Sequence, residues 1–312
     1  LHALLLVRGH LRVALRDGAR DVGPETSRHS LVGRNHPFAH LAMTDRPPSS
    51  RASLTAWRIV NVITLVVVLA ANGAAGSGAM SGESIGVIAN RYRSDFLPAN
   101  YVFGIWSLIY LWLTAFTVYQ ALPGDGPREA VQRIGPWWVI TSLLNIAWIT
   151  AFSFSRFALA MVVMLALLVS LVIVAERVQP LADGARAATR WCVAYPFALY
   201  LAWISVAIIA NTFQYAHVVQ WGGFGIAEST WSAIMMGVAT LLGTAMVATR
   251  GLWLFPLVVA WALWGIGARY ADVPILHLTA QGLVGIGLVL GVMAWGWRRR
   301  RTAGSAPRAV TA

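Results

Sequence analysis

The sequence predicts an all-α integral membrane protein with about eight transmembrane helices, and three observations support this. Apolar residues make up 58% of the 312 residues and charged residues only 12%, whereas a soluble domain carries about 25% charged residues. The mean hydropathy is +0.64. The apolar residues are grouped in eight runs, each close to the roughly 20 residues that a helix needs to cross a bilayer. This composition excludes a disordered chain and argues against an ordinary soluble enzyme.

The eight apolar runs follow one another between residues 57 and 297. Only Ser155 and Arg156 separate the third run from the fourth, and only Arg250 and Gly251 separate the sixth from the seventh. We expect both pairs to form antiparallel neighbours, because such short connections leave no other arrangement. The predicted spans are residues 57–76, 101–122, 136–154, 157–175, 189–212, 231–249, 252–270 and 275–297.

Residues 1–56 form a polar N-terminal segment that we expect to be disordered. Residues 1–42 contain five of the seven His but no Trp and no apolar run of spanning length. Met43 begins the stretch Met-Thr-Asp-Arg-Pro-Pro, which is typical of a cytoplasmic start before a first membrane helix. We therefore hypothesise that Met43 is the natural start and that residues 1–42 are not native. N-terminal protein sequencing tests this hypothesis.

The arginines predict the orientation of the spans, since cytoplasmic loops are enriched in basic residues. The basic residues are all Arg, and from Met43 onward fourteen of them lie on one alternating set of connecting segments and four on the other. We therefore expect a multi-pass protein of the cell membrane with both termini in the cytoplasm. Residues 298–312 then form a basic cytoplasmic tail attracted to anionic lipid, which explains the net charge of +12 better than nucleic-acid binding does.

The middle of each span lacks the chemistry of most catalytic and ion-coupled sites. No Asp, Glu, Lys, Arg or His lies in the central part of a span, although such residues mark most proton- and ion-coupled pathways. The chain has no HExxH motif, no GxSxG motif and no Lys for a phosphate-binding loop. Cys192 is the single cysteine, so an internal disulfide is excluded. We assign no catalytic residue, no metal ligand and no cofactor.

Three of the spans carry aromatic and amide side chains on one helix face. Residues three or four apart share a face, and such sets occur in the second, third and fifth spans. Aromatic planes with a few hydrogen-bonding groups suit a flat, largely apolar ligand. Helix packing would use the same residues, so spacing alone leaves both interpretations open. The candidate ligand-binding residues are Trp106, Tyr110, Asn145, Trp148, Trp203 and Ala207.

Three motifs distinguish these spans from generic apolar helices. Residues 97–110 read LPANYVFGIWSLIY, residues 144–152 read LNIAWITAF, and residues 200–207 read YLAWISVA. All three resemble the motifs of the TspO/MBR family, that is, the translocator protein or tryptophan-rich sensory proteins, and they occur in the family's order and spacing. The similarity covers about residues 57–215, and the longer chain is similar to long bacterial forms with extra C-terminal helices.

The resemblance implies a bundle of five helices over residues 57–215 that binds porphyrins, sterols and similar hydrophobic ligands. In the family the pocket lies between the second, third and fifth helices. Carried over to this chain, its residues are Trp106, Asn145, Trp148, Trp203 and Ala207. The family's first loop closes the pocket, and this chain has a different sequence there, at residues 90–96. The identity of the ligand therefore stays open.

The last three spans, within residues 216–297, lie outside the five-helix pattern. The final span contains a GxxxG motif at Gly287 and Gly291, which permits close approach of two helices. The motif could form a homodimer or pack against the five-helix unit, and we favour this internal packing.

The sequence therefore predicts a receptor- or sensor-like membrane protein that binds a flat hydrophobic ligand, such as a porphyrin or a sterol-like molecule. A small-molecule transporter is one alternative. A porphyrin-degrading enzyme that uses Trp chemistry is another, although we favour binding over catalysis because no acid–base group is in place. The expected partners are a hydrophobic small molecule and the lipid bilayer, with a tetrapyrrole as the ligand we consider first.

Overall fold

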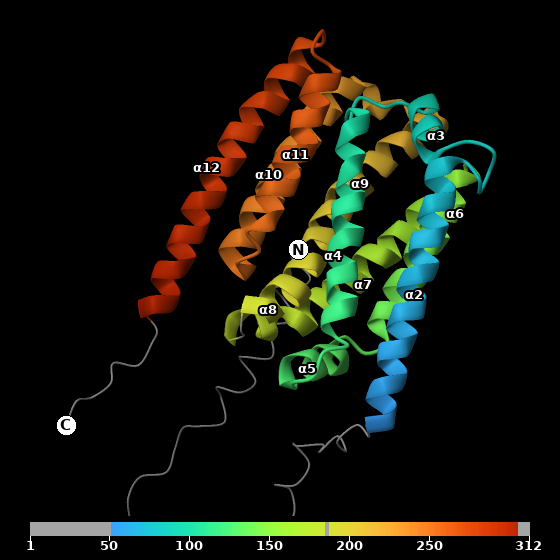
Figure 1. Ribbon diagram of the computed structural model, residues 1–312. Helices are drawn as coiled ribbons and strands as arrows, with labels where there is room; N and C mark the ends of the chain where they lie inside the picture. Colours follow the sequence, from blue (N-terminus) through green and yellow to red (C-terminus); the bar gives the residue numbers. More distant parts are fainter. Residues whose placement is uncertain (1–50, 185–186, 305–312) are drawn as a thin grey trace, which may run out of the picture. The chain divides into compact units, whose positions relative to one another are not determined.

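The computed structural model describes residues 51–184 and 187–304, and all its regular elements are helices (Figure 1). Six helices are long and apolar enough to cross a membrane, and a bent pair would make a seventh span. The prediction of an all-α multi-pass membrane protein is thus confirmed. The hypothesis about Met43 concerns residues that lie outside the described ranges.

Each predicted apolar run forms a helix. The main helices are α2 (Arg51–Ser77), α4 (Ile105–Tyr119), α6 (Trp137–Ser153), α7 (Phe157–Gly184), α9 (Tyr195–Val218), α10 (Glu228–Arg250), α11 (Leu254–Arg269) and α12 (Pro274–Gly304). The shorter elements are α3 (Ile85–Arg91), η1 (Asn100–Gly104), α5 (Asp125–Ile134), α8 (Ala187–Thr189), η2 (Arg190–Ala194) and η3 (Gly223–Gly225). Among the main helices, α4 reaches spanning length together with η1, as residues Asn100–Tyr119, whereas α6 and α11 have 17 and 16 residues. The expected eight spans are therefore matched by six long helical segments, the bent pair α5–α6 and the shorter α11.

A sharp bend joins α5 to α6. The two helices meet at 57°, at Gly135, whose φ of 52° and ψ of −133° suit a residue without a side chain. Pro136 follows and occupies the N-cap position of α6. Because α5 buries Ala130, Val131 and Ile134 on one face and is polar on the other, it is an amphipathic helix.

The central helix of the fold is α9. In its most apolar stretch 78% of the residues are buried, against 22–39% in the other five long helices. It contacts α4, α7, α10 and α11, and hydrophobic residues lie all around it, as expected of a helix with no exposed face. Small residues such as Ala198, Ala202 and Ser205 are fully enclosed and allow neighbouring helices to approach closely.

The three C-terminal helices pack on one another, and α10 and α11 also pack on α9. A side-chain carbon added at Gly287 would lie 3.0 Å from Thr240 of α10, and one added at Gly291 would lie 3.0 Å from Pro256 of α11. The GxxxG motif therefore packs within the chain, but on α10 and α11 rather than on the five-helix unit.

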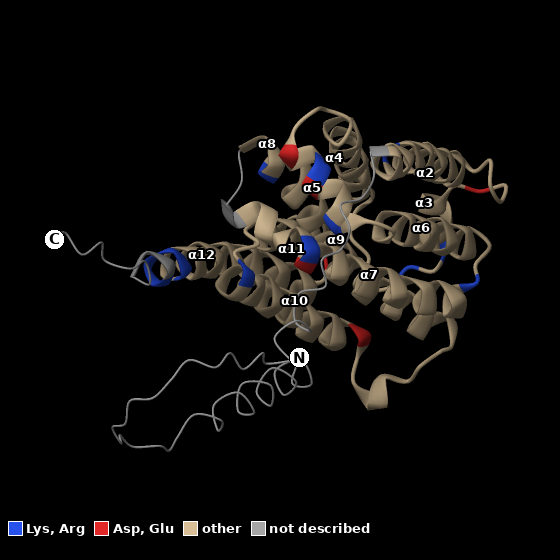
Figure 2. Cartoon of the chain, turned by 90° about the horizontal axis from the view of Figure 1, so that it is seen from below, with Lys and Arg blue, Asp and Glu red and all other residues tan. Residues whose placement is uncertain are grey.

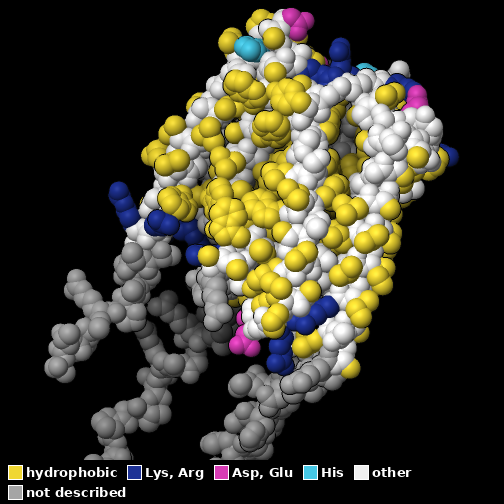
Figure 3. All heavy atoms as spheres, in the orientation of Figure 1, with side chains coloured by type: hydrophobic (Ala, Val, Ile, Leu, Met, Phe, Trp, Pro, Cys, Tyr) yellow, Lys and Arg dark blue, Asp and Glu magenta, His cyan; other side chains and the backbone are white. Residues whose placement is uncertain are grey.

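Charged residues gather toward the two ends of the helical body, while hydrophobic side chains cover the surface between them (Figure 3). The start of α2 and the end of α12 lie at the same end (Figure 1), which Figure 2 views directly, with arginines on α5 and α12. At this end Arg177 donates to the carbonyl of Arg133, and Arg298 donates to that of Thr249. The described arginines of the larger set thus share one end. The assignment of this end to the cytoplasm stays a prediction.

We expect Gly265→Ala to destabilise the packing of α11 on η1. The added carbon would lie 2.0 Å from Cγ2 of Val102, so helix or side chain must shift, at a cost of about 1–3 kcal/mol. Thermal unfolding of the purified protein in detergent measures the loss.

Gly282→Ala is the matched control, because nothing lies within 4 Å of the added carbon in α12. Alanine favours a helix over glycine by up to about 1 kcal/mol, so this variant should be neutral or slightly stabilised. Equal unfolding temperatures for the two variants would contradict the close contact between α11 and η1.

Candidate functional site

A cavity of about 500 Å³ lies among α2, α4, α6, α9 and α11, near the end that carries α3. This volume is within the range of about 300–1,000 Å³ found for small-molecule sites. The lining residues are all uncharged, and most are apolar or aromatic. The cavity can therefore hold a hydrophobic molecule, with a few amide, hydroxyl and indole groups available as hydrogen-bonding partners.

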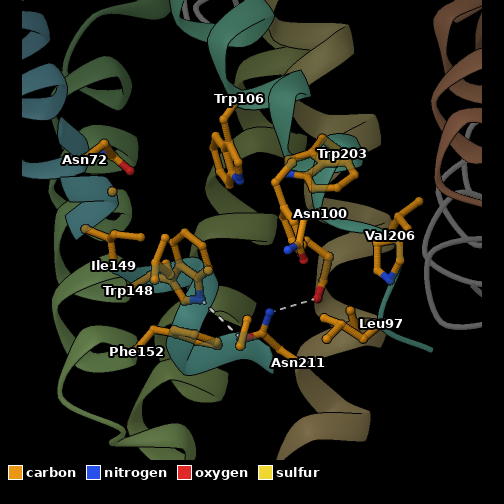
Figure 4. Close-up of a pocket in the computed structure, with 18 of the residues that line it drawn as sticks. Asn72, Leu97, Asn100, Trp106, Trp148, Ile149, Phe152, Trp203, Val206 and Asn211 are labelled. Atoms are coloured by element: carbon orange, nitrogen blue, oxygen red, sulfur yellow. Dashed lines mark hydrogen bonds between the residues drawn. The ribbon is translucent and has the colours of Figure 1, made fainter. Parts of the chain in front are cut away.

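Three tryptophans from three helices surround this space (Figure 4). Trp106 of α4 stacks on Trp148 of α6 with ring centroids 5.6 Å apart and an angle of 23°. It also meets Trp203 of α9 edge to face, at 6.2 Å and 86°. Such offset and perpendicular arrangements are the favourable ones for aromatic rings. The three indoles form a wall with both flat and edge-on surfaces.

Five of the six candidate residues line this cavity, namely Trp106, Tyr110, Trp148, Trp203 and Ala207. The sixth residue, Asn145, is absent from the lining and has only 1% of its surface exposed. Its amide accepts a hydrogen bond from Asn72 Nδ2 at 2.8 Å and donates one to the Tyr200 hydroxyl at 2.8 Å. The structure thus places Asn145 behind the wall, where it holds α2, α6 and α9 together.

Two polar atoms of the lining residues are buried without a hydrogen-bond partner. They are Nε1 of Trp203 and the hydroxyl oxygen of Tyr110, whose contact with the Asn145 amide does not meet hydrogen-bond geometry. A buried donor without a partner costs about 1–3 kcal/mol, and such groups are rare in native structures. A ligand that offers hydrogen-bond acceptors would remove this cost.

Two of the lining residues, Trp148 and Asn211, are joined by a hydrogen bond. Trp148 Nε1 donates to Oδ1 of Asn211 at 3.4 Å, and Asn211 Nδ2 donates to the carbonyl of Ala207 at 3.0 Å (Figure 4). This chain of bonds fixes the indole of Trp148 against α9.

Several lining residues were not among the predicted ones. Asn72 is one of two amides in the first apolar run, with Asn61, and an amide among apolar residues is a signal that could have identified it. Ala262 and Ile266 come from α11, outside the five-helix pattern. No local signal in the sequence distinguishes them, because they are ordinary helix residues that reach the cavity only through packing of α11 on α9.

The mouth of the cavity lies between α2 and α4. Among the lining residues, Leu69, Gly73 and Gly76 of α2 and Ser107 of α4 are exposed. Nothing lies within 4 Å of a side-chain carbon added at Gly73 or Gly76. Since hydrophobic side chains surround this opening (Figure 3), an apolar molecule could enter from the bilayer.

Residues 92–99, here called the roof segment, close the end of the cavity, and α10 holds their centre. Phe96, Leu97 and Pro98 face the cavity. The backbone N–H of Asp95 donates to Glu228 at 2.9 Å, and its carbonyl accepts from the Ser232 hydroxyl at 2.9 Å. Both partners lie in the first turns of α10, 133 and 137 residues away in the sequence.

A second set of hydrogen bonds joins the roof segment to α11. Arg269 donates to the carbonyl of Pro98 at 2.6 Å and to Oδ1 of Asn90. The Tyr270 hydroxyl donates to the carbonyl of Ser94 at 2.6 Å. Hydrogen bonds from a charged donor are among the stronger ones. The C-terminal helices therefore hold the roof segment over the cavity.

The roof segment also carries an unfavourable charge. Partial burial, and then the nearby carboxylate of Glu228, raise the pKa of Asp95 above its usual value. The folded protein therefore disfavours the ionised form of this side chain.

Comparison with known proteins gives one match. A family model described as "TSPO-like protein" matches residues 58–295. This range includes the three C-terminal helices as far as Trp295, beyond the 57–215 over which the motifs carry the similarity. Neither the curated proteins nor the solved structures contain a match to the chain.

We expect Arg269→Gln to loosen the roof segment without unfolding the protein. The loss of charge-assisted hydrogen bonds worth about 1.5–3 kcal/mol should speed hydrogen exchange of the amides in residues 92–99 by about 10- to 100-fold. Exchange followed by mass spectrometry measures this directly. Arg156→Gln removes an exposed arginine from the turn between α6 and α7 and should leave roof exchange unchanged; equal effects of both changes would contradict the proposed anchor.

We expect Asp95→Asn to stabilise the protein slightly at neutral pH. The raised pKa of Asp95 means that its ionised form weakens the folded state above that pKa, and that the penalty disappears below the pKa of the unfolded chain. The gain in unfolding temperature, at most about 2 °C for a partly exposed group, should therefore shrink as the pH falls toward 4. A gain that grows on acidification would contradict this account.

Proposed function

The chain belongs to the TSPO-like family, which makes it a receptor- or sensor-type membrane protein, and from this premise we propose that it binds a flat hydrophobic ligand of the tetrapyrrole class. The proposed site is the cavity among α2, α4, α6, α9 and α11. The observation that carries the proposal is the uncharged cavity walled by three tryptophans, with buried hydrogen-bonding atoms left without a partner.

The shape of the aromatic wall supports a planar ligand. The Trp106 and Trp148 rings are nearly parallel, whereas Trp203 stands almost perpendicular to Trp106. A planar ring system could lie against the face of one indole while its edge meets another, and both contacts are favourable. An elongated aliphatic chain would gain less from this wall, because it has no π face to stack.

The two unpartnered atoms add a polar requirement. The indole N–H of Trp203 can only donate a hydrogen bond, and the Tyr110 hydroxyl can donate or accept. A ligand with a nitrogen or oxygen acceptor near its edge would satisfy at least one of them. A pure hydrocarbon would leave both without a partner and would bind less tightly for that reason.

The roof segment offers a way for ligand binding to affect the rest of the protein. Phe96 and Leu97 line the cavity, while Asp95 and Pro98 beside them are bonded to α10 and α11. A ligand that presses on the roof would act on the same segment that the C-terminal helices hold. We propose sensing on this basis rather than transport, because no charged residue lines the cavity to couple movement to an ion.

We expect saturable binding of protoporphyrin IX to the purified protein in detergent, measured by quenching of tryptophan fluorescence. Trp106→Leu removes the ring that stacks on Trp148 and should weaken binding by about tenfold. Trp203→Phe keeps an aromatic ring but removes the N–H donor, and should weaken binding by about two- to tenfold.

Trp264→Leu is the control, because this side chain is 51% exposed on α11 and does not line the cavity. It should bind the porphyrin like the wild type. Absence of saturable binding, or affinities that none of the changes alters, would show that the three indoles serve packing only. Loss of porphyrin absorbance under light in the wild type would instead favour the degrading enzyme.

A further inference from the structure

The connection between α9 and α10 presents aromatic and aliphatic side chains to the outside of the protein. Residues 219–227, here called the aromatic loop, read VQWGGFGIA and contain no charged side chain. Phe224 is 85% exposed, more than any other large hydrophobic side chain in the described part of the chain. Trp221 and Ile226 beside it are also exposed. Exposed apolar patches of this kind are typical of interaction surfaces.

The aromatic rings at this loop form one cluster with a defined arrangement. Trp221 meets Phe224 edge to face, with ring centroids 5.4 Å apart at 88°, and lies 5.7 Å from the ring of Trp231 in α10. The indole N–H of Trp231 donates to the carbonyl of Gly223 at 2.9 Å. The backbone N–H of Ile226 donates to the same carbonyl at 3.0 Å. The loop is therefore pre-organised, which lowers the entropy lost when it binds a partner.

The backbone of the loop is strained at Phe224. Its φ of 56° and ψ of 29° lie in the left-handed region, which a residue with a side chain rarely adopts. Gly223 and Gly225 on either side also have positive φ, of 60° and 79°. A third glycine would form this turn with less strain, so the turn itself does not explain the aromatic ring. Strain of this kind concentrates where a residue has a function.

The aromatic loop lies at the same end of the helical body as the roof segment. The residue after the loop, Glu228, accepts from the backbone N–H of Asp95, and Ser232 one turn later donates to the carbonyl of Asp95. The helices on both sides of the loop are long and apolar enough to cross a membrane. A short connection between two spans lies where they leave the hydrocarbon core, at the level of the lipid headgroups.

Neighbouring connections at this end carry charges that favour water. The turn between α11 and α12 exposes Asp272, and Glu83, before α3, forms an ion pair with Arg91. The aromatic loop carries no charge and instead has the side chains that concentrate at the boundary between headgroups and acyl chains, above all Trp and Phe. Its composition therefore suits a lipid surface better than water.

We propose that the aromatic loop inserts Trp221, Phe224 and Ile226 into the interface of the lipid bilayer and anchors the start of α10 there. The Trp221 indole has an N–H that can donate to headgroup oxygens while its ring lies among the first acyl carbons. Loop backbone groups need partners of their own, so the loop lies in the hydrated interface and not in the hydrocarbon core. This surface is separate from the proposed tetrapyrrole site, since no loop residue lines that cavity.

Depth-dependent fluorescence quenching of the full chain in phosphatidylcholine vesicles tests the proposal. In a Cys192→Ser background, which removes the single cysteine, Ile226→Cys takes a nitrobenzoxadiazole probe and leaves Phe224 in place. We expect phosphatidylcholine with a nitroxide at the top of its acyl chain to quench this probe. Iodide in the water should quench it little, because interfacial apolar groups lie about 5–10 Å below the headgroup surface.

The same probe on Asp272→Cys is the matched control, because this residue is exposed on a charged turn at the same end. Iodide should quench the control probe, and the nitroxide lipid should quench it about threefold less than the probe on the loop, given the difference in depth. Equal lipid quenching at both positions would overturn the proposal, because the probe's own affinity for lipid would then explain the result.

A charge placed on the loop gives a second test. Phe224→Asp, added to the protein labelled at residue 226, should move the probe into water and exchange lipid quenching for iodide quenching, because a carboxylate is disfavoured below the headgroups. Ala271→Asp adds the same charge to the turn between α11 and α12 and should leave the probe unchanged. Without Phe224→Asp, strong iodide quenching would overturn the proposal. Shielding from both quenchers would also overturn it, because protein, such as a second copy of the chain, would then cover the loop.

Discussion

The burial of α9 on all sides is the constraint on which the rest of this fold depends. Within a bilayer no hydrophobic force drives helices together, so a central helix must be held by close packing and by interhelical hydrogen bonds. Small residues such as Ala202 and Ser205 allow that packing, and Asn145 ties its neighbour α6 to Tyr200. Because α9 contacts α4, α7, α10 and α11, the N-terminal spans and the C-terminal helices form one packed body around it.

The tryptophan-lined cavity results from the same arrangement. On the side of α2 the cavity is lined by Gly73 and Gly76 instead of large side chains, and the indoles of α4, α6 and α9 line it from the other helices. The C-terminal helices then complete what the first five spans leave open. From α11, Ala262 and Ile266 supply part of the wall, and Arg269 holds the roof segment through Pro98. These contacts give the additional helices a structural role at the candidate site.

The tryptophan-lined cavity and a second cavity of about 560 Å³ differ in chemistry and lie toward opposite ends of the helical body. The first is uncharged, since an unpaired charge away from water would be costly, and its specificity rests on aromatic faces and a few donors. The second lies among Trp253, Trp295 and four arginines, where water and headgroups can solvate a guanidinium. The TSPO-like family accounts for a membrane receptor or sensor; that the first cavity holds a hydrophobic ligand is our proposal.

The sequence by itself determined the class of fold, the order of the helices and three of the aromatic faces, because hydropathy and helical spacing are local properties of the chain. Trp106, Trp148 and Trp203 could be identified in this way. Only the tertiary structure decided that Asn145 lies behind the cavity wall, that α11 contributes to it, and that Gly287 and Gly291 pack within the chain. Each of these depends on contacts between residues far apart in the sequence, as between Arg269 and Pro98. Such contacts follow from how helices pack in three dimensions, and no local pattern of residues encodes them.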